Sequence, residues 1–147
     1  MGTSIVIKMG GGTIGATDTT MEDIVSLSKS DIFPVLVHGG GSTVTEWLSD
    51  LGIKTDFVNG LRVTDENVLK VATAVLTGLV NKNIVAGIHR SGGRAIGISG
   101  IDDAMVVAEI QDPELGQVGE VKQVNPDLVL AAIENRIIPV ISSISLT

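Results

Sequence analysis

Residues 32–41 read Ile32-Phe33-Pro34-Val35-Leu36-Val37-His38-Gly39-Gly40-Gly41, a short apolar run that ends in three glycines. Both alternating faces of the run are apolar, which is typical of a strand covered by helices on both sides. A similar run at 5–9 leads into Gly10-Gly11-Gly12. In an open α/β sheet, ligands bind just beyond the carboxyl ends of the strands. The two glycine triplets therefore predict both a fold class and the position of a binding site.

Other patterns along the chain complete the predicted fold. Two more apolar runs predict strands at 95–98 and 137–142, and the segments 105–110 and 118–124 predict a β-hairpin. Helices are expected at 20–29, 43–51, 65–90 and 126–135. The order of these elements predicts an α/β fold: a three-layer αβα sandwich with a mostly parallel open sheet plus a β-hairpin, formed by residues 1–147 as a single domain.

The helix expected at 65–90 has the clearest pattern in the chain. Its apolar residues recur at three- and four-residue spacing, and Thr64 is expected to cap its first turn. Gly78, inside the stripe, predicts a kink or a close contact with another element. Ser42 is expected to cap the preceding helix. The stripe of the long helix is wider than one sheet face needs, which favours a homodimer.

Composition excludes several classes of function. The chain of 147 residues has a formal net charge of −7, which makes nucleic acid an improbable partner. It contains no cysteine, so disulfides, thiolate metal sites and cysteine nucleophiles are ruled out. No His-carboxylate pattern indicates a bound metal. We find no targeting segment and no apolar run near the roughly 18 residues of a membrane span, so a cytoplasmic location is expected.

Two cations lie where they could accompany the glycine triplets. Lys8 precedes the first triplet, and a lysine in an apolar strand is costly to desolvate unless an anion is near, which favours a role on phosphate. Arg62 lies in a predicted loop before the long helix and could bind a carboxylate through two hydrogen bonds. Backbone N–H groups in glycine loops form concavities for anions.

Two competing motifs are weaker. The spacing Gly10-x-Gly12-x-x-Gly15 formally fits a dinucleotide-binding oxidoreductase, but the acidic residue expected after the second strand is absent. The segment 38–41, HGGG, is similar to an oxyanion-hole motif of lipases, but 97–101, GISGI, does not complete the GxSxG pattern of a nucleophile.

The segments IVIKMGG (5–11), VLVHGGG (35–41) and NGLRVTD (59–65) together resemble the N-acetylglutamate kinases of the amino acid kinase family. Further matches in the same order are NK (81–82), AIGISG (95–100), LGQVG (115–119) and IPVI (138–141). The resemblance implies phosphorylation of the side-chain carboxylate of N-acetyl-L-glutamate to an acyl phosphate, as in arginine biosynthesis, with ATP and Mg²⁺.

By resemblance, each candidate residue acquires a role. Lys8, Gly11 and Gly39 would contact the transferring phosphoryl group, with Gly10 also at the nucleotide phosphates. Gly39, Gly40 and Arg62 would hold the acetylated amino acid, with Arg62 on its α-carboxylate. A carboxylate with a pKa near 4 is ionised at pH 7. The nucleophile therefore needs no general base.

The chain also departs from the family. The family's nucleotide half, with an Asn-x-Asn-Ala-Asp segment and a second lysine, would follow residue 147. This chain alone is therefore expected to be the amino-acid-binding and dimerisation domain, and inactive by itself. Asp103 stands where the family usually has glycine. Two alternatives stay open: a non-catalytic module that binds N-acetylglutamate or another dicarboxylate, and a kinase for carrier-linked aminoadipate.

Overall fold

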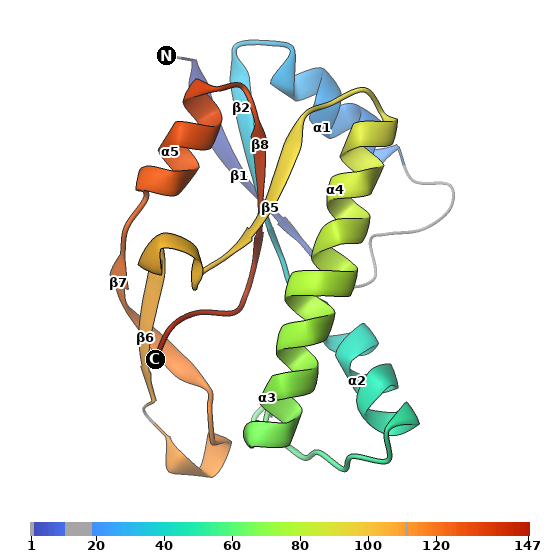
Figure 1. Cartoon of the computed structure of the whole chain (residues 1–147), viewed down its shortest axis with the longest axis vertical. Coiled ribbons are helices and arrows are strands. Elements are labelled where there is room, and N and C mark those ends of the chain that lie inside the picture. Colours follow the sequence, from blue (N-terminus) through green and yellow to red (C-terminus); the bar gives the residue numbers. More distant parts are fainter. Residues whose placement is uncertain (1, 11–18, 111) are drawn as a thin grey trace.

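The computed structural model describes residues 2–10, 19–110 and 112–147. Its centre is a four-stranded parallel sheet in the order β1-β2-β8-β5 (Figure 1). The strands are β1 (Thr3–Met9), β2 (Ile32–His38), β5 (Ala95–Ser99) and β8 (Ile138–Ser142). All four apolar runs thus form strands as predicted, with small differences at their ends.

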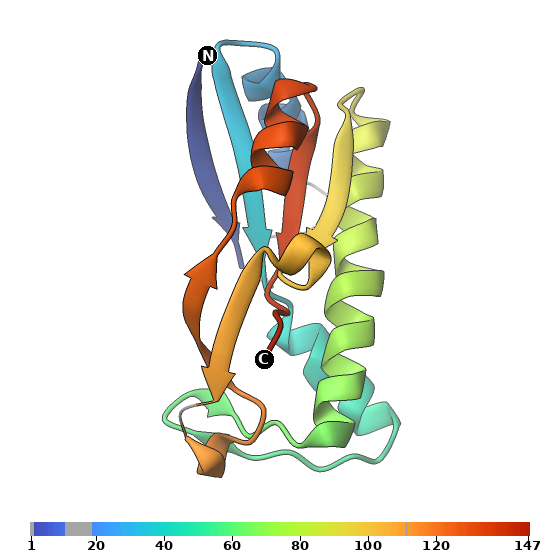
Figure 2. The same ribbon diagram turned by 60° about the vertical axis from the view of Figure 1, so that its left-hand side comes forward.

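Helices cover both faces of this sheet, which confirms the three-layer sandwich. Figures 1 and 2 show α5 (Asp127–Glu134) on one side and α1 (Thr20–Ser28) with α4 (Asn81–Arg90) on the other. The core between the sheet and α1 and α4 consists of buried apolar residues: Met9, Ile24, Val25, Leu36, Ile84, Ile88, Ile138 and Val140. Burial of these side chains is the main force that holds the layers together.

Two antiparallel hairpins lie outside the sheet. The predicted one pairs β6 (Val106–Ile110) with β7 (Gly119–Val124), and Figure 2 shows it extending past the carboxyl ends of the parallel strands. The other pairs β3 (Phe57–Val58) with β4 (Leu61–Arg62). Arg62, expected in a loop, therefore lies in a short strand. Single 3₁₀ turns occur at Asp102–Ala104 and Pro113–Leu115.

The long helix is continuous but changes its hydrogen bonding along its length. It begins with α3 (Glu66–Thr73), passes through a π-helical segment (Ala74–Val80) and ends with α4. Gly78 lies inside the π-helical segment, and a Cβ added there would meet no atom within 4 Å. Within residues 2–10, 19–110 and 112–147, nothing makes the close contact considered at Gly78. A second core cluster joins this helix to α2 (Gly41–Asp50): Val44, Leu48, Val68, Val75 and Leu76.

The observed N-termini of α3 and α2 correct two predictions about helix caps. Asp65, rather than Thr64, caps α3, and its Oδ1 accepts hydrogen bonds from the N–H groups of Asn67 at 2.9 Å and Val68 at 2.8 Å. Ser42 does not cap α2, because that helix already begins at Gly41 and no side chain among the described residues bonds to its first amides.

The expectation about membrane spans also needs correction. The helix Glu66–Arg90 is long and apolar enough to cross a membrane by length and composition. Length and composition alone are weak evidence for a membrane span, because the core helix of a soluble protein meets the same two criteria. Val68, Val75, Ile84 and Ile88 of this helix are buried in the two core clusters.

Candidate functional site

The second glycine triplet forms a tight loop between β2 and α2. Gly40 has φ +153°, and a Cβ there would lie 2.9 Å from Leu76 Cδ2 and 3.1 Å from Val80 Cγ2. Only glycine combines this backbone conformation with so close an approach to the long helix. The first N–H groups of α2 follow directly and receive no cap from any side chain that the structure describes. Uncapped amides at a helix N-terminus favour an anion.

A buried polar cluster lies beneath the loop and joins three elements. His38 and Asn81 are 2% and 1% exposed. The Nδ1 of His38 lies 2.8 Å from the Gly39 carbonyl oxygen, and its Nε2 lies 3.0 Å from Asn81 Nδ2. Asn81 Nδ2 also donates to the Val140 carbonyl at 2.9 Å. Burial lowers the pKa of His38, and the hydrogen bond to Gly39 partly opposes that shift.

Lys82 extends the cluster to β5. Its Nζ donates to Asn81 Oδ1 at 3.2 Å and to the Gly97 carbonyl at 3.1 Å. Gly97 is required at this point, because a Cβ there would overlap Asn81 Oδ1 and lie 2.7 Å from Lys82 Nζ.

Arg62 is held against the start of α2. Its Nη2 donates to the Gly41 carbonyl at 3.0 Å and to Thr45 Oγ1 at 2.7 Å, and the guanidinium lies 4.6 Å from the centre of the Phe57 ring. Its Nη1 is buried and has no hydrogen-bond partner within the described part of the chain. Burial lowers the pKa of Arg62. The group stays charged at neutral pH because its ordinary pKa is so high.

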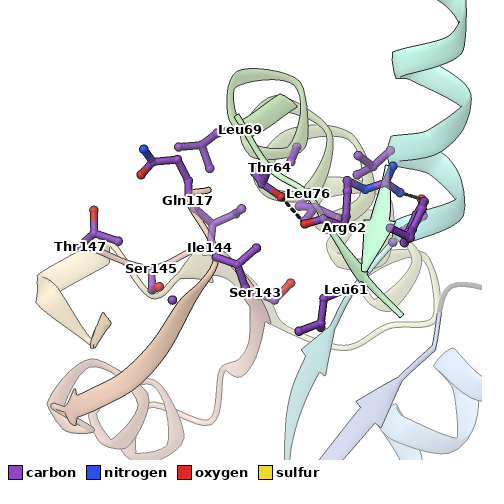
Figure 3. A pocket seen from close by; sticks show the side chains of 18 of the residues that line it. Leu61, Arg62, Thr64, Leu69, Leu76, Gln117, Ser143, Ile144, Ser145 and Thr147 are labelled. Carbon is purple, nitrogen blue, oxygen red and sulfur yellow. Dashed lines mark hydrogen bonds between the residues drawn. The ribbon is translucent and has the colours of Figure 1, made fainter. Parts of the chain in front are cut away.

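The glycine loop, Phe57 and Arg62 line a cavity of about 510 Å³. Gly39, Gly40 and Arg62 contribute to its wall together with residues 117–119 and 143–145. Figure 3 shows Thr64, Leu76 and Arg62 across from Ser143, Ile144 and Ser145. This volume is within the range of small-molecule sites.

The wall formed by the β6–β7 hairpin is tied to the base of α3. The Thr64 N–H donates to the Leu115 carbonyl at 3.0 Å, and the Gln117 N–H donates to the Thr64 carbonyl at 2.7 Å. Gly116 between them has φ +66°, and a Cβ there would overlap the Thr64 carbonyl oxygen. The connection at 115–117 therefore fixes one side of the cavity.

A second, smaller cavity lies at the glycine loop beside the end of β1. It has a volume of about 210 Å³, and Met9, Gly10, Gly39, Gly40 and Asn83 contribute to its wall. Gly39 and Gly40 therefore border both cavities.

The predicted site residues are brought together to different degrees. Gly39, Gly40 and Arg62 share the larger cavity, and Gly10 joins the two glycines at the smaller one. Lys8 is exposed on β1, where it pairs with Val37, and lines neither of these cavities. Gly11 lies outside the described residues. In the described ranges, no three acidic or histidine side chains gather as metal ligands.

Several side chains of the site were given no role in the sequence analysis. Asn81 carried a usable signal, since it lies three and seven residues before the buried Ile84 and Ile88 and so shares their helix face. A polar residue on such a face indicates a buried hydrogen bond. Thr45 and Phe57 carried no signal, because their contacts with Arg62 depend on the packing of β3 and β4 beside α2.

The parallel sheet, the glycine loop at its carboxyl edge and the arginine-lined cavity define an α/β domain with a cavity of small-molecule size that contains donors suited to an anion. Comparison with known proteins is more specific. The sequence model described as "Amino acid kinase family" matches residues 3–147, and the chain belongs to this family.

Similar sequences and structures support that assignment. The chain is 47% identical over 141 residues to the acetylglutamate kinase of Dehalococcoides mccartyi strain BAV1, covering 96% of this chain and 52% of the relative. It is 46% identical to the acetylglutamate kinase of Syntrophomonas wolfei, covering 99% of this chain and 52% of that protein. The chain thus spans about half the length of the curated relatives it matches.

Among solved structures, smu.665 from Streptococcus mutans has a TM-score of 0.81 at 28% identity, covering 95% of this chain and 58% of that one. An N-acetylglutamate synthase from Neisseria gonorrhoeae, solved with coenzyme A and N-acetyl-glutamate, has a TM-score of 0.77 at 21% identity, covering 99% of this chain and 34% of that one. At that identity the second match supports the fold alone.

Proposed function

We propose that this chain is the amino-acid-binding half of an enzyme that phosphorylates the side-chain carboxylate of N-acetyl-L-glutamate with ATP and Mg²⁺. The observation that carries the proposal is that Arg62 and the Gly39–Gly41 loop border one cavity and are bonded to each other. An arginine beside a loop of amide donors suits a ligand with two carboxylates. The acetylglutamate kinases similar to this chain support this choice of ligand.

The chain's residues would bind and orient the acceptor. Arg62 would take the α-carboxylate, which would give its buried Nη1 the acceptor it lacks within the described residues. Gly39, Gly40 and the first amides of α2 would hold the other carboxylate. No proton has to be removed from that group at neutral pH. Its oxygen forms a bond to the γ-phosphorus, the bond from that phosphorus to the bridging oxygen breaks, and ADP leaves.

The smaller cavity fits only part of the second substrate. About 210 Å³ beside Gly10, Gly39 and Gly40 suits a phosphoryl group and is below the usual size of a nucleotide site. By resemblance, Lys8 would neutralise charge on the phosphoryl oxygens and the amides of Gly10 and Gly11 would donate to them, which is what phosphoryl transfer requires of the protein. Lys8 lines neither cavity, so this role requires its side chain to turn toward the phosphoryl group. We assign the rest of the nucleotide and Mg²⁺ to a second domain.

The proposal extends to the organisation of the protein. Residues 1–147 would form one domain for amino-acid binding and dimerisation, in a cytoplasmic homodimer with no nucleic-acid or membrane partner. Light scattering tests the dimer, and a strictly monomeric species would argue against it.

Calorimetry with N-acetyl-L-glutamate tests the binding site. We expect Arg62→Ala to weaken binding at least about tenfold, because a charge-assisted pair is lost. Arg90→Ala is the matched control, because Arg90 is exposed at the far end of the long helix. Equal affinities for the two variants would refute the assignment of Arg62.

Activity distinguishes an enzyme from a binding module. Hydroxylamine traps an acyl phosphate as a hydroxamate, so its formation from ATP and N-acetyl-L-glutamate can be followed directly. We expect little turnover from residues 1–147 alone and turnover from a protein that also contains the second domain. Binding without turnover in that longer protein would favour the non-catalytic alternative.

A further inference from the structure

The cluster of His38, Asn81 and Lys82 lies directly beneath the proposed site. His38 and Asn81 are buried, whereas Lys82 is exposed, and His38 also borders the smaller cavity. The cluster links β2, the start of α4, β5 and β8 through side-chain hydrogen bonds. Buried polar groups are costly, so a fully bonded network at this depth needs a reason beyond packing.

The partners fix the direction of every hydrogen bond in the cluster. A carbonyl oxygen only accepts, so His38 Nδ1 must carry the proton that bonds to the Gly39 carbonyl. Nε2 is then an acceptor and takes the hydrogen bond from Asn81 Nδ2, which also donates to Val140. Asn81 Oδ1 accepts from Lys82. Donation thus runs from Lys82 through Asn81 and His38 to Gly39.

The hydrogen bond from His38 to the Gly39 carbonyl fixes the orientation of the Gly39–Gly40 peptide in the loop. The Gly39–Gly40 peptide is trans, as are all described peptide bonds, so the Gly40 N–H points opposite to the Gly39 carbonyl. Because His38 holds that carbonyl inward, the Gly40 N–H is turned away from the cluster. Leu76 and Val80 pack against Gly40 and limit its movement.

We propose that His38 and Asn81 are positioning residues of this site: together they hold the Gly39 carbonyl inward and present the Gly40 N–H to the reacting carboxylate. The inference rests on the proposed function, because that function places the carboxylate at the loop. Protonated His38 would donate from both nitrogens and lose its bond with Asn81. Lys82 on α4 is the charged member of the cluster, and it contacts Asn81. No described carboxylate contacts the His38 ring.

Two substitutions test the hydrogen bonds of His38 Nδ1 and Nε2 separately. The side-chain amide of asparagine reaches the position of Nδ1, whereas that of glutamine reaches the position of Nε2. His38→Asn can therefore still donate to the Gly39 carbonyl, while His38→Gln can keep only the hydrogen bond that it accepts from Asn81 through its amide oxygen. Both remove the ring and its titration. His89→Gln, at an exposed histidine on α4, is the control.

The expected result is a split between the variants. His38→Asn should keep the Kd for N-acetyl-L-glutamate within about threefold of the wild type, and His38→Gln should raise it about tenfold, the usual effect of one lost hydrogen bond. Both should have similar melting temperatures. Equal losses of affinity in the two variants would mean a structural role only and would overturn the inference.

Spectroscopy of the ligand-free protein tests the network independently of ligand binding. Nitrogen-15 NMR of wild-type His38 should show the proton on Nδ1. The Gly40 amide resonance should move further in His38→Gln than in His38→Asn, because both variants lose the ring but only His38→Gln loses the bond to the Gly39 carbonyl. A proton on Nε2 would overturn the inference even if neither variant folds. If the wild type binds no N-acetyl-L-glutamate, the proposed function fails, whereas these resonances still confirm or refute the hydrogen-bond order.

Discussion

Replacing Gly97 by alanine should lower the free energy of unfolding by about 3 kcal/mol. A Cβ at this position would overlap Asn81 Oδ1 and lie 2.9 Å from Asn81 Cγ. Asn81 cannot move aside freely, because its Nδ2 is bonded to His38 Nε2 and to the Val140 carbonyl. The added methyl group therefore forces the buried amide out of its hydrogen bonds.

The magnitude follows from the groups left without partners. Each buried donor or acceptor that loses its partner costs about 1–3 kcal/mol, and Asn81 shares two bonds with His38 and Val140. Part of this cost is offset by about 0.4–1 kcal/mol, because alanine has less freedom than glycine in the unfolded chain. A net loss of about 3 kcal/mol remains.

Urea denaturation followed by circular dichroism measures this loss. Gly78→Ala is the matched control: the site is helical and open, so this variant should gain about 0.5–1 kcal/mol. The double variant Gly97→Ala/Asn81→Ala should cost less than the sum of the single changes, because the overlap disappears with the amide. A stability of Gly97→Ala within about 0.5 kcal/mol of the wild type would refute this account of the cluster.

Four further outcomes can be measured in the same way. Asp65→Ala should cost about 1 kcal/mol, since it removes two capping bonds at α3, and an unchanged midpoint would contradict the cap. Asp103→Gly should gain about 0.5–1 kcal/mol, because Asp103 has φ +53°, and a loss would show a favourable role for its side chain. Ser142→Ala should gain about 1 kcal/mol by removing a buried hydroxyl that has no partner in the described structure, and a loss would reveal a hidden hydrogen bond. Burial lowers the pKa of His38 from 6.5, so its contribution to stability is present above pH 6.5 and is lost as pH falls toward the folded-state pKa. His38→Asn should lose this pH dependence, and an unchanged slope of stability against pH would contradict the assignment to His38.

The elements of the fold were predictable because their signals are local. An apolar run such as 32–37 forms a strand whatever its partner, and the stripe from Val68 to Ile88 forms a helix through side chains three and four residues apart. The change to π-helical hydrogen bonding at Ala74–Val80 was not predicted. It adds no recognisable residue pattern, since the stripe stays apolar throughout.

Only those parts of the candidate site that depend on residue type and on position along a strand could be predicted from the sequence. Glycine loops at strand ends indicate an anion site because of the sheet's topology, which is why Gly39 and Gly40 are candidates. Arg62 was identified by residue type and resemblance. Its orientation was not predictable, because its partners Gly41 and Thr45 are 21 and 17 residues away.

Residue order alone was therefore sufficient for the strands, the helices and the positions of the glycine loops, because turns, strands and helical stripes depend on near neighbours. The buried cluster beneath the loop needed the folded chain. Asn81 meets His38 across 43 residues and Val140 across 59 residues. Such contacts depend on the order of strands in the sheet and on the phase of the long helix, and both are results of packing the whole domain at once.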